Sequence, residues 1–229
     1  MATRVRVAVL GVGSLGQQHA RIYAEMHRQD AVELVGVYDT DPAQAKAIAE
    51  KHDTTALGSI EAAAAAADAL SIVTPTVTHH TLAKPLLELG KHLLVEKPMT
   101  DNAAQAAELV SLAKRHDCVL QVGHIERFNP VFNYLQQAAR EPRFIESHRL
   151  SPFPARSMDI GVVLDLMIHD LDIVLAFVRS PVEHVDAAGV RVLSASEDIA
   201  NARLRFSNGC VANLTVSRVS PESLRKIRV

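Results

Sequence analysis

The sequence predicts an α/β protein of two domains: a doubly wound parallel sheet over residues 1–123 and, over 124–229, an α/β domain with an open, mainly antiparallel sheet. Three observations lead to this prediction. Short apolar segments alternate with helix-like segments up to residue 123, which is the pattern of βαβ units. A glycine-rich loop follows the first apolar segment. After residue 123 the alternation ends, and two segments of alternating polarity flank Asn208-Gly209, a strong signal for a hairpin turn.

The strands of the first domain are expected where Val, Ile and Leu form short runs, because a sheet covered by helices on both sides needs strands that are apolar on both faces. These runs are 4–10, 33–38, 69–73, 92–95 and 119–122. Helix signals lie between them: Asp41 before Pro42 is typical of a capped helix start, and Ser59 precedes a run of alanine, the best helix former. We expect helices at 14–28, 42–51, 60–67, 78–89 and 103–116.

The second domain has a different pattern. We expect a helix at 131–139, a loop at 151–159 and a long apolar helix at 162–178. We expect strands at 143–150, 182–190, 199–206 and 210–219, with another beginning at 226–229. Alternating polarity in the later strands predicts a sheet with one solvent-exposed face. So few strands make a small domain, and we expect it to be incomplete at its C-terminus.

Composition argues against several classes of protein. The 229 residues include 24 Lys and Arg against 26 Asp and Glu, whereas nucleic-acid-binding domains usually carry a basic excess. No apolar segment is long enough to cross a bilayer, and the N-terminus enters the first strand without a signal segment, so we expect no membrane partner. The two cysteines, Cys118 and Cys210, are typical of a reducing compartment, and we expect a cytoplasmic protein.

The glycine-rich loop has the spacing Gly11-x-Gly13-x-x-Gly16, between an expected strand and an expected helix. Gly11 permits a tight turn, Gly13 lets a pyrophosphate approach the backbone, and Gly16 lets the helix, whose first N–H groups face the phosphates, pack near the strand. Asp39 ends the second strand, where a carboxylate can bind both ribose hydroxyls and repel a 2′-phosphate. The alternative is a glycine turn without a ligand and a surface aspartate. We expect NAD, contacted by Gly11, Gly13, Ser14, Leu15, Gly16 and Asp39.

Two more groups follow the ends of expected strands, where open α/β sheets bind ligands. Glu96 and Lys97 end the fourth strand, and the lysine can reach a nicotinamide ribose and a substrate hydroxyl; the alternative is a surface Glu–Lys pair. Thr74 and Pro75 end the third strand and precede His79, which either borders the nicotinamide or begins an exposed helix. The expected cofactor contacts therefore also include Thr74, Pro75, His79, Glu96 and Lys97.

Ionisable residues on the long apolar helix need an explanation, because such groups are rarely buried. Asp165 and His169 stand at positions i and i+4 and share one helix face, and Asp172 follows. His169 can accept the proton of an alcohol, while Asp165 orients the imidazole or binds the substrate. Two alternatives are a hydrogen-bonded core histidine with capping acids, and a zinc site. Because the cysteines lie far apart and no HExxH motif is present, we expect no metal.

Taken together, these motifs resemble the Gfo/Idh/MocA oxidoreductases. The resemblance covers the whole chain and is carried by segments 8–21, 74–80, 90–98 and 164–174 and by the Arg127-Phe128-x-Pro130 turn. It implies a Rossmann domain followed by an α/β domain whose open sheet joins copies into a homo-oligomer, a dimer or a tetramer. It also implies an enzyme that oxidises a secondary alcohol of a sugar or cyclitol, with Lys97, Asp165 and His169 as catalytic residues.

Segments 122–132 and 143–174 are similar, more narrowly, to bacterial UDP-N-acetylglucosamine 3-dehydrogenases. That likeness implies oxidation at C3 to a 3-keto sugar nucleotide, a step in lipid A biosynthesis. Arginine binds diphosphates bidentately, so Arg127 is an expected substrate contact; the alternative is that Arg127 joins the two domains. The expected substrate contacts are Arg127, Asn129, Arg156, Asp165 and His169, and His148 and Arg149 are also expected near the diphosphate or sugar.

The chain departs from the pattern of many relatives at 159–163, where a glycine-rich run usually precedes the Asp165–His169 pair, so we expect a different pocket wall. Other activities stay open at this point: an inositol or free-sugar dehydrogenase, an NAD-using glycosidase, or a catalytically silent NAD-binding protein. The presence of Lys97, Asp165 and His169 together argues against the silent protein.

Overall fold

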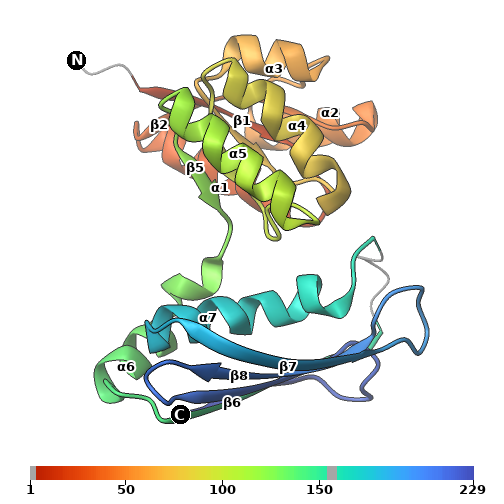
Figure 1. The fold of residues 1–229 in the computed structure, drawn as a ribbon. Coiled ribbons are helices and arrows are strands. Elements are labelled where there is room, and N and C mark those ends of the chain that lie inside the picture. The colour runs from red at the N-terminus through yellow and green to blue at the C-terminus, as the bar shows by residue number, and fades with distance from the viewer. Residues whose placement is uncertain (1–3, 154–158) are drawn as a thin grey trace. The chain divides into compact units, whose positions relative to one another are not determined.

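The computed structural model describes residues 4–153 and 159–229 (Figure 1). Arg156, one of the expected substrate contacts, lies outside the described residues. The chain divides into two compact units, the first ending at Gly123 and the second beginning at His124. Each unit has a sheet and a hydrophobic core of its own, so we describe the two units separately.

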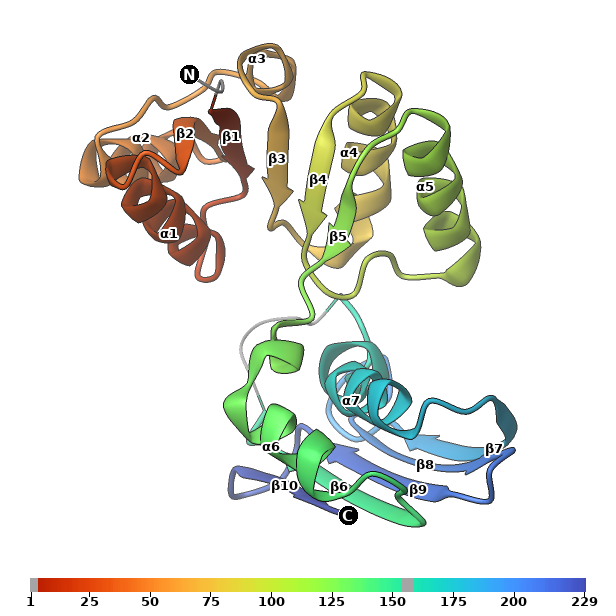
Figure 2. The same ribbon diagram turned by 90° about the vertical axis from the view of Figure 1, so that its left-hand side faces the viewer.

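The first unit contains a five-stranded sheet in the order β2-β1-β3-β4-β5, in which every pair is parallel (Figure 2). The strand order reverses direction beside β1, and helices connect the strands, so the predicted doubly wound parallel sheet is confirmed. The strands are β1 (Val5–Leu10), β2 (Val32–Tyr38), β3 (Ala69–Ile72), β4 (His92–Val95) and β5 (Leu120–Val122).

Helices cover both faces of this sheet. On one face α1 and α2 pack against Val9 and Val37, and on the other α3, α4 and α5 pack against Leu10, Leu70 and Leu93. The helices are α1 (Gly16–Arg28), α2 (Pro42–His52), α3 (Ile60–Ala66), α4 (Thr76–Glu88) and α5 (Ala103–Arg115). In β1 and β2, apolar side chains on both faces are buried, as the sequence predicts, whereas the edge strand β5 has no buried residue and exposes Gln121.

The capping signals in the sequence mark helix starts correctly. The Asp41 carboxylate accepts hydrogen bonds from the backbone N–H groups of Ala43 and Gln44 at 2.9 and 3.3 Å, and the Ser59 hydroxyl accepts one from Ala62. Two other starts differ from the predictions: α1 begins at Gly16 rather than at residue 14, and α4 begins at Thr76 rather than at residue 78. In both cases no side chain caps the helix, so the sequence carries no capping signal there.

The second unit contains a five-stranded mixed sheet in the order β10-β6-β9-β8-β7. Its strands are β6 (Phe144–Leu150), β7 (Val182–Val190), β8 (Ile199–Phe206), β9 (Val211–Ser217) and β10 (Leu224–Arg228). Three of the pairs are antiparallel, but β6 and β9 are parallel. The sheet is therefore mainly antiparallel, as predicted, around one parallel pair that the sequence does not signal.

One face of this sheet packs against helices and the other is polar. Phe132 of α6 (Pro130–Ala138) and Val174 and Phe177 of α7 (Ile168–Val178) cover buried Leu204 and Leu214, and Figure 1 shows α7 lying along the sheet. On the opposite face lie half-buried or exposed polar side chains, among them Glu146, His148, Asn201, Arg203, Asn213 and Thr215. The predicted solvent-exposed face is present.

The long apolar helix expected at 162–178 is not uniform. Val163–Met167 form a π-helical turn, η2, and the α-helical stretch α7 begins only at Ile168. π-helical turns are rare, occur mostly as single turns within α-helices and are frequently found at functional sites. The predicted helix is present, but helical periodicity is too coarse a signal to reveal the π-helical turn at its N-terminal end.

No helix among the described residues is both long enough and apolar enough to cross a membrane.

Candidate cofactor site and catalytic helix

The glycine-rich loop connects β1 to α1, and two of its glycines are required by the protein itself. Gly11 has φ of +84°, and a Cβ there would lie 2.6 Å from the Val73 carbonyl oxygen. A Cβ on Gly16 would collide with the carbonyl oxygen of Gly11, because α1 begins directly against the loop. These two positions therefore fix the shape of the turn.

The backbone of Val12 holds the loop in place through two side chains. Its N–H donates to Oδ2 of Asp39 at 2.7 Å, and its carbonyl oxygen accepts from Nε2 of Gln44 at 2.9 Å. The sequence pattern predicts a ribose contact for Asp39 but no function for Gln44, whose only signal is its place in the first turn of α2. The half-buried Asp39 carboxylate thus holds the loop in shape.

The remaining loop positions fit a dinucleotide phosphate group. A Cβ on Gly13 would meet no heavy atom within 4 Å. Packing within the protein therefore does not require glycine here, and its absence of a side chain leaves open space in front of the backbone. Within the described part of the chain, no protein group accepts a hydrogen bond from the backbone N–H groups of exposed Ser14 and Leu15. Free N–H groups before a helix suit an anion, and Asp39 suits an unphosphorylated ribose, so these residues fit NAD.

His79 does not begin an exposed helix, which was one of its two interpretations. It lies in the first turns of α4, and its side chain is 1% exposed. Its Nδ1 lies 2.9 Å from the Pro98 carbonyl oxygen, and its Nε2 lies 2.9 Å from the Thr74 carbonyl oxygen. Because both ring nitrogens face backbone carbonyls, the imidazole connects the loop after β3 to the loop after β4.

Glu96 is buried, so the surface Glu–Lys pair is excluded. Its Oε1 lies 3.2 Å from Nε2 of His19 on α1, and its Oε2 accepts a hydrogen bond from the Lys97 backbone N–H at 3.2 Å. A Cβ on Gly123 would lie 2.5 Å from the same carboxylate. Glu96 therefore holds the end of β4 and the peptide of Lys97, which precedes a cis bond to Pro98. His19 had no assigned function in the sequence analysis.

In the second unit, Asp165 lies in the π-helical turn and His169 at the start of α7. Two further acids on the same helix bind arginines. Asp172 accepts hydrogen bonds from Nε and Nη2 of Arg127 at 2.8 and 2.6 Å, which raises the pKa of Arg127 above its usual value. Buried Asp170 binds Arg149 in the same bidentate way.

The other expected substrate residues near this helix are engaged in local structure. Arg127 lies in a 3₁₀ turn, η1 (Ile125–Phe128), and binds Asp172 of its own unit. Asn129 is exposed; its Oδ1 accepts from the Val131 N–H as the cap of α6, and its Nδ2 donates to Glu126 at 3.2 Å. Their expected contacts with a sugar diphosphate stay predictions.

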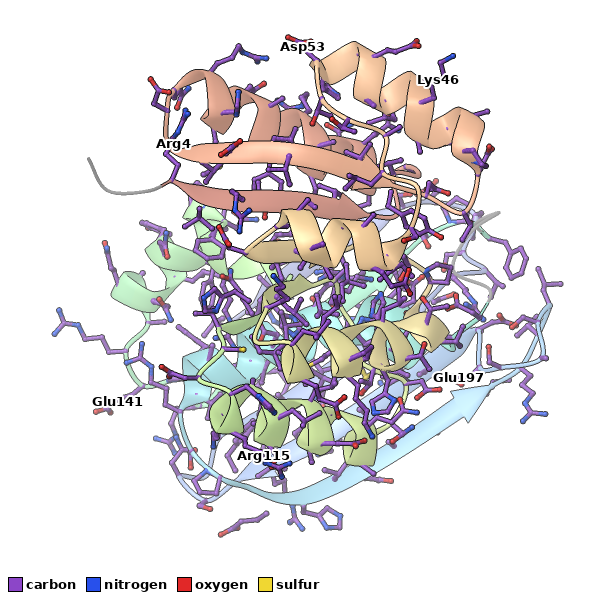
Figure 3. All side chains as sticks on the ribbon, turned by 90° about the horizontal axis from the view of Figure 1, so that it is seen from above. Arg4, Lys46, Asp53, Arg115, Glu141 and Glu197 are labelled. Carbon is purple, nitrogen blue, oxygen red and sulfur yellow. The ribbon has the colours of Figure 1, made fainter. Side chains whose placement is uncertain are left out.

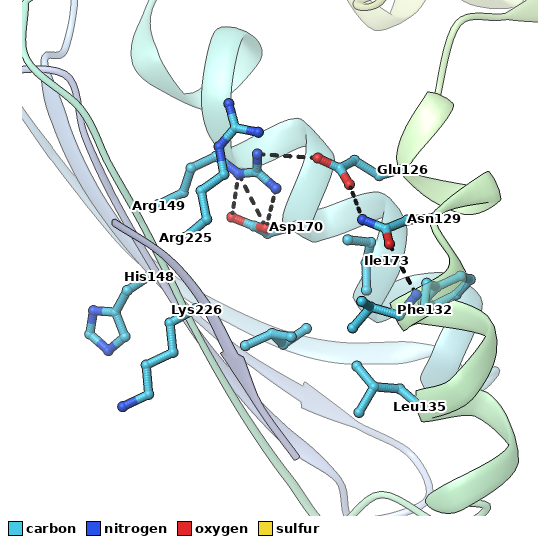
Figure 4. A pocket seen from close by; sticks show the side chains of 12 residues that line it. Glu126, Asn129, Phe132, Leu135, His148, Arg149, Asp170, Ile173, Arg225 and Lys226 are labelled. Atoms are coloured by element: carbon cyan, nitrogen blue, oxygen red, sulfur yellow. Dashed lines mark hydrogen bonds and ion pairs between the residues drawn. The ribbon is translucent and has the colours of Figure 1, made fainter. Parts of the chain in front are cut away.

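A cavity of about 180 Å³ lies between η1, α6, α7 and β10 (Figure 4). Arg149 lies between Asp170 and Glu126 along its wall, and Arg225 extends beside them. Burial disfavours the ionised form of Glu126, but hydrogen bonding from Asn129 and the charge of Arg149 outweigh it and lower the pKa of Glu126. The volume of the cavity is below the roughly 300 Å³ that is typical of ligand pockets.

Among the described residues, no group of three or more His, Cys, Asp and Glu side chains gathers in a way that can hold a metal ion.

Family models match both units. Residues 5–124 match the Gfo/Idh/MocA oxidoreductase family with its NAD-binding Rossmann fold, and residues 136–229 match the Gfo/Idh/MocA C-terminal domain. The boundary between the matches lies close to the division of the structure after Gly123.

Known proteins are similar to this chain over both of its units. UDP-N-acetylglucosamine 3-dehydrogenase from Acidithiobacillus ferrooxidans is 41% identical over 98% of this chain and 71% of its own length. Its crystal structure superposes with a TM-score of 0.91, covering 98% of this chain and 73% of the other. An inositol 2-dehydrogenase from Rhizobium meliloti is 32% identical over 73% of this chain and 53% of its own length. This chain therefore belongs to the Gfo/Idh/MocA family and is an NAD-dependent oxidoreductase.

Proposed function

We propose that this protein oxidises the C3 hydroxyl of UDP-N-acetylglucosamine to a 3-keto sugar nucleotide. The observation that carries the proposal is the 41% identity to a UDP-N-acetylglucosamine 3-dehydrogenase over 98% of the chain. Inositol 2-dehydrogenases are similar at lower identity and over less of their length, so a cyclitol is the second candidate substrate.

The first unit supplies the cofactor contacts in this proposal. Gly13, Ser14 and Leu15 receive the pyrophosphate, and the Asp39 carboxylate binds the adenosine ribose. The loops that His79 joins bring Thr74, Pro75 and Lys97 toward the nicotinamide side. Bound NAD supplies the two-electron acceptor for the hydride that leaves the carbinol carbon.

The protein's own contribution is proton transfer and electrostatics. His169 accepts the hydroxyl proton, and Asp165 orients the imidazole or binds the sugar. Lys97 places positive charge near the reacting oxygen, where negative charge develops as the proton departs. Arg127, Asn129 and Arg156 are proposed to bind the sugar nucleotide, and for Arg127 this requires sharing its guanidinium with Asp172.

We also propose a setting for this reaction. The polar open face of the second sheet, with Glu146, His148 and Arg203, would join copies of the chain into a dimer or tetramer in the cytoplasm. The 3-keto product would pass to an aminotransferase that makes a 3-amino sugar for lipid A. Light scattering of the purified chain tests the assembly.

A single-turnover experiment tests the substrate. Enzyme in excess over UDP-N-acetylglucosamine is mixed with NAD, and the absorbance of reduced nicotinamide is followed, because excess enzyme draws an uphill oxidation forward. We expect a signal with the sugar nucleotide and none with free N-acetylglucosamine or myo-inositol. A signal with inositol alone identifies the second candidate, whereas sugar release without net reduction identifies an NAD-using glycosidase. Cofactor binding without a signal from any substrate contradicts the proposal.

Asp39 is expected to set the preference for NAD over NADP. Asp39→Asn keeps an oxygen that can accept the Val12 N–H but removes the charge that repels a 2′-phosphate. We expect the ratio of NADP affinity to NAD affinity to rise about tenfold, a difference of about 1.4 kcal/mol. Titration of each cofactor measures the ratio. Asp41→Asn is the matched control, since Asp41 caps α2 and should leave the ratio unchanged; an equal ratio for wild type and Asp39→Asn would remove Asp39 from cofactor selection.

A further inference from the structure

The N-terminal end of the catalytic helix is held by the loop between β7 and β8. The backbone N–H of Val162 donates to the carbonyl oxygen of Glu197 at 2.9 Å, and the N–H of Val163 donates to Oε1 of the same residue at 3.2 Å. Figure 3 labels Glu197. The Glu197 carboxylate therefore accepts a hydrogen bond from the first residue of the π-helical turn η2, although Glu197 belongs to a different element.

The approach between this carboxylate and the helix is close. A Cβ on Gly161, two residues before η2, would collide with the carboxylate of Glu197, so any side chain at residue 161 would have to displace that carboxylate. From there the first helical hydrogen bond runs from the Asp165 N–H to the Gly161 carbonyl oxygen at 3.0 Å. Glu197 and Gly161 together define where the helical backbone begins.

A buried ion pair fixes Asp198, the residue that follows Glu197. Asp198 and Arg218 are both 0% exposed, and Nε of Arg218 donates to Oδ1 of Asp198 at 2.8 Å. Asp198 also accepts from the N–H groups of Val192, Leu193 and Ser194. Burial opposes ionisation of Asp198, but the hydrogen bonds from Ser194 and Arg218 prevail and hold its pKa well below its usual range.

The same arginine also reaches the segment that precedes the helix. Nη1 of Arg218 donates to the carbonyl oxygen of Ile160 at 2.9 Å, while Nη2 donates to the hydroxyls of Ser194 and Ser196. One guanidinium thus binds the loop that carries Glu197 and the chain just before η2. The two segments cannot move apart without breaking buried, charge-assisted hydrogen bonds, which are costly to lose.

We propose that Glu197, fixed by the Arg218–Asp198 pair, is a positioning residue that holds η2 in its π-helical form and so orients Asp165 and His169 for proton transfer. The inference rests on the proposed function, which makes these two residues catalytic. A five-residue π turn is a rare conformation, and here its first N–H is held by a side chain from another element. Without an acceptor at the Val163 N–H, the turn relaxes toward α-helical geometry, which rotates Asp165 relative to His169.

Three variants test the proposal through kinetics. Glu197→Ala removes the acceptor, Glu197→Gln keeps an amide oxygen in its place, and Glu222→Ala removes an exposed carboxylate of the same unit as a control. We expect kcat of Glu197→Ala to fall about 10- to 100-fold, as small misplacements of catalytic groups do, while Kd for NAD stays unchanged. Glu197→Gln should recover most of the loss. Equal losses in the Ala and Gln variants, or unchanged kcat in Glu197→Ala, overturn the proposal.

Hydrogen exchange supplies a readout that does not need activity. We expect the amides of 163–168 to exchange faster in Glu197→Ala than in wild type or Glu197→Gln, with the β8–β9 amides unchanged. If wild type turns over neither UDP-N-acetylglucosamine nor inositol, the proposed function fails, and exchange alone decides whether Glu197 holds the turn. Unchanged exchange at 163–168 overturns the inference in either case. Should Glu197→Ala not fold, Glu197→Asp, whose side chain is shorter by one methylene, must show the same exchange pattern.

Discussion

Replacing Lys97 with methionine is expected to lower turnover about 10³-fold, equivalent to about 4 kcal/mol of transition-state stabilisation, and to leave the Kd of NAD largely unchanged. Methionine keeps the length of the aliphatic side chain and removes the ammonium group. The charge matters most when the substrate hydroxyl loses its proton, so its loss should act on kcat rather than on cofactor binding. Single-turnover rates and an NAD titration on the same preparation measure the two effects.

Lys91→Met is the matched control for this variant. Lys91 precedes β4, the strand that Lys97 follows, and its Nζ donates to the Ala67 carbonyl oxygen at 2.8 Å, away from the strand end that carries Lys97. We expect Lys91→Met to keep wild-type turnover. If Lys97→Met loses NAD affinity as much as turnover, Lys97 is a cofactor-binding residue and has no separate catalytic function.

Gly16→Ala is expected to abolish detectable NAD binding. The added Cβ collides with the Gly11 carbonyl oxygen, so α1 must move away from the loop that receives the pyrophosphate. Forcing extra atoms into a packed site costs about 1–3 kcal/mol of folding free energy, so the melting temperature should fall as well. An NAD titration and thermal unfolding followed by circular dichroism measure both effects.

Two other glycines separate protein packing from ligand approach. The Cβ that Gly13→Ala adds meets no protein atom within 4 Å, so the variant should fold with wild-type stability. We expect it to weaken NAD binding about tenfold or more, which corresponds to about 1.4 kcal/mol. Gly58→Ala also meets nothing within 4 Å and lies outside the loop, so it should change neither quantity. NAD affinity that survives in both Gly13→Ala and Gly16→Ala would contradict the assignment of this loop to the pyrophosphate.

Local signals in the sequence predicted most of the fold. Runs of Val and Leu mark the strands of the first sheet, and Asp41 and Ser59 mark helix starts, because each signal acts within a few neighbouring residues. The parallel pairing of β6 with β9 was not predictable in this way. Those strands are separated by a helix and two other strands, so their pairing depends on tertiary packing.

In the candidate site, too, local motifs were predictable and contacts between distant segments were not. The glycine spacing and Asp39 were recognisable because they form a contiguous strand–loop–helix motif and a strand end. Contacts between distant segments were not, such as the His19–Glu96 pair and the hydrogen bond from the Val163 N–H to Glu197. Nothing in the sequence indicates that Asp172 binds Arg127 either.

The Asp39 carboxylate has two functions, and this restricts how cofactor preference can evolve in this chain. Its Oδ2 fixes the glycine loop through the Val12 N–H, and its charge faces the place proposed for the ribose. A single substitution of Asp39 by a small apolar residue would remove the hydrogen bond to the loop together with the charge. Such a variant would have a damaged cofactor site before it gained any use of NADP. Asparagine keeps an acceptor for the Val12 N–H and removes the charge, at the cost of the second acceptor that Oδ1 offers to the Asp41 N–H. An evolutionary or engineered path toward NADP is therefore expected to pass through a neutral hydrogen-bond acceptor at residue 39 before a cation is recruited nearby.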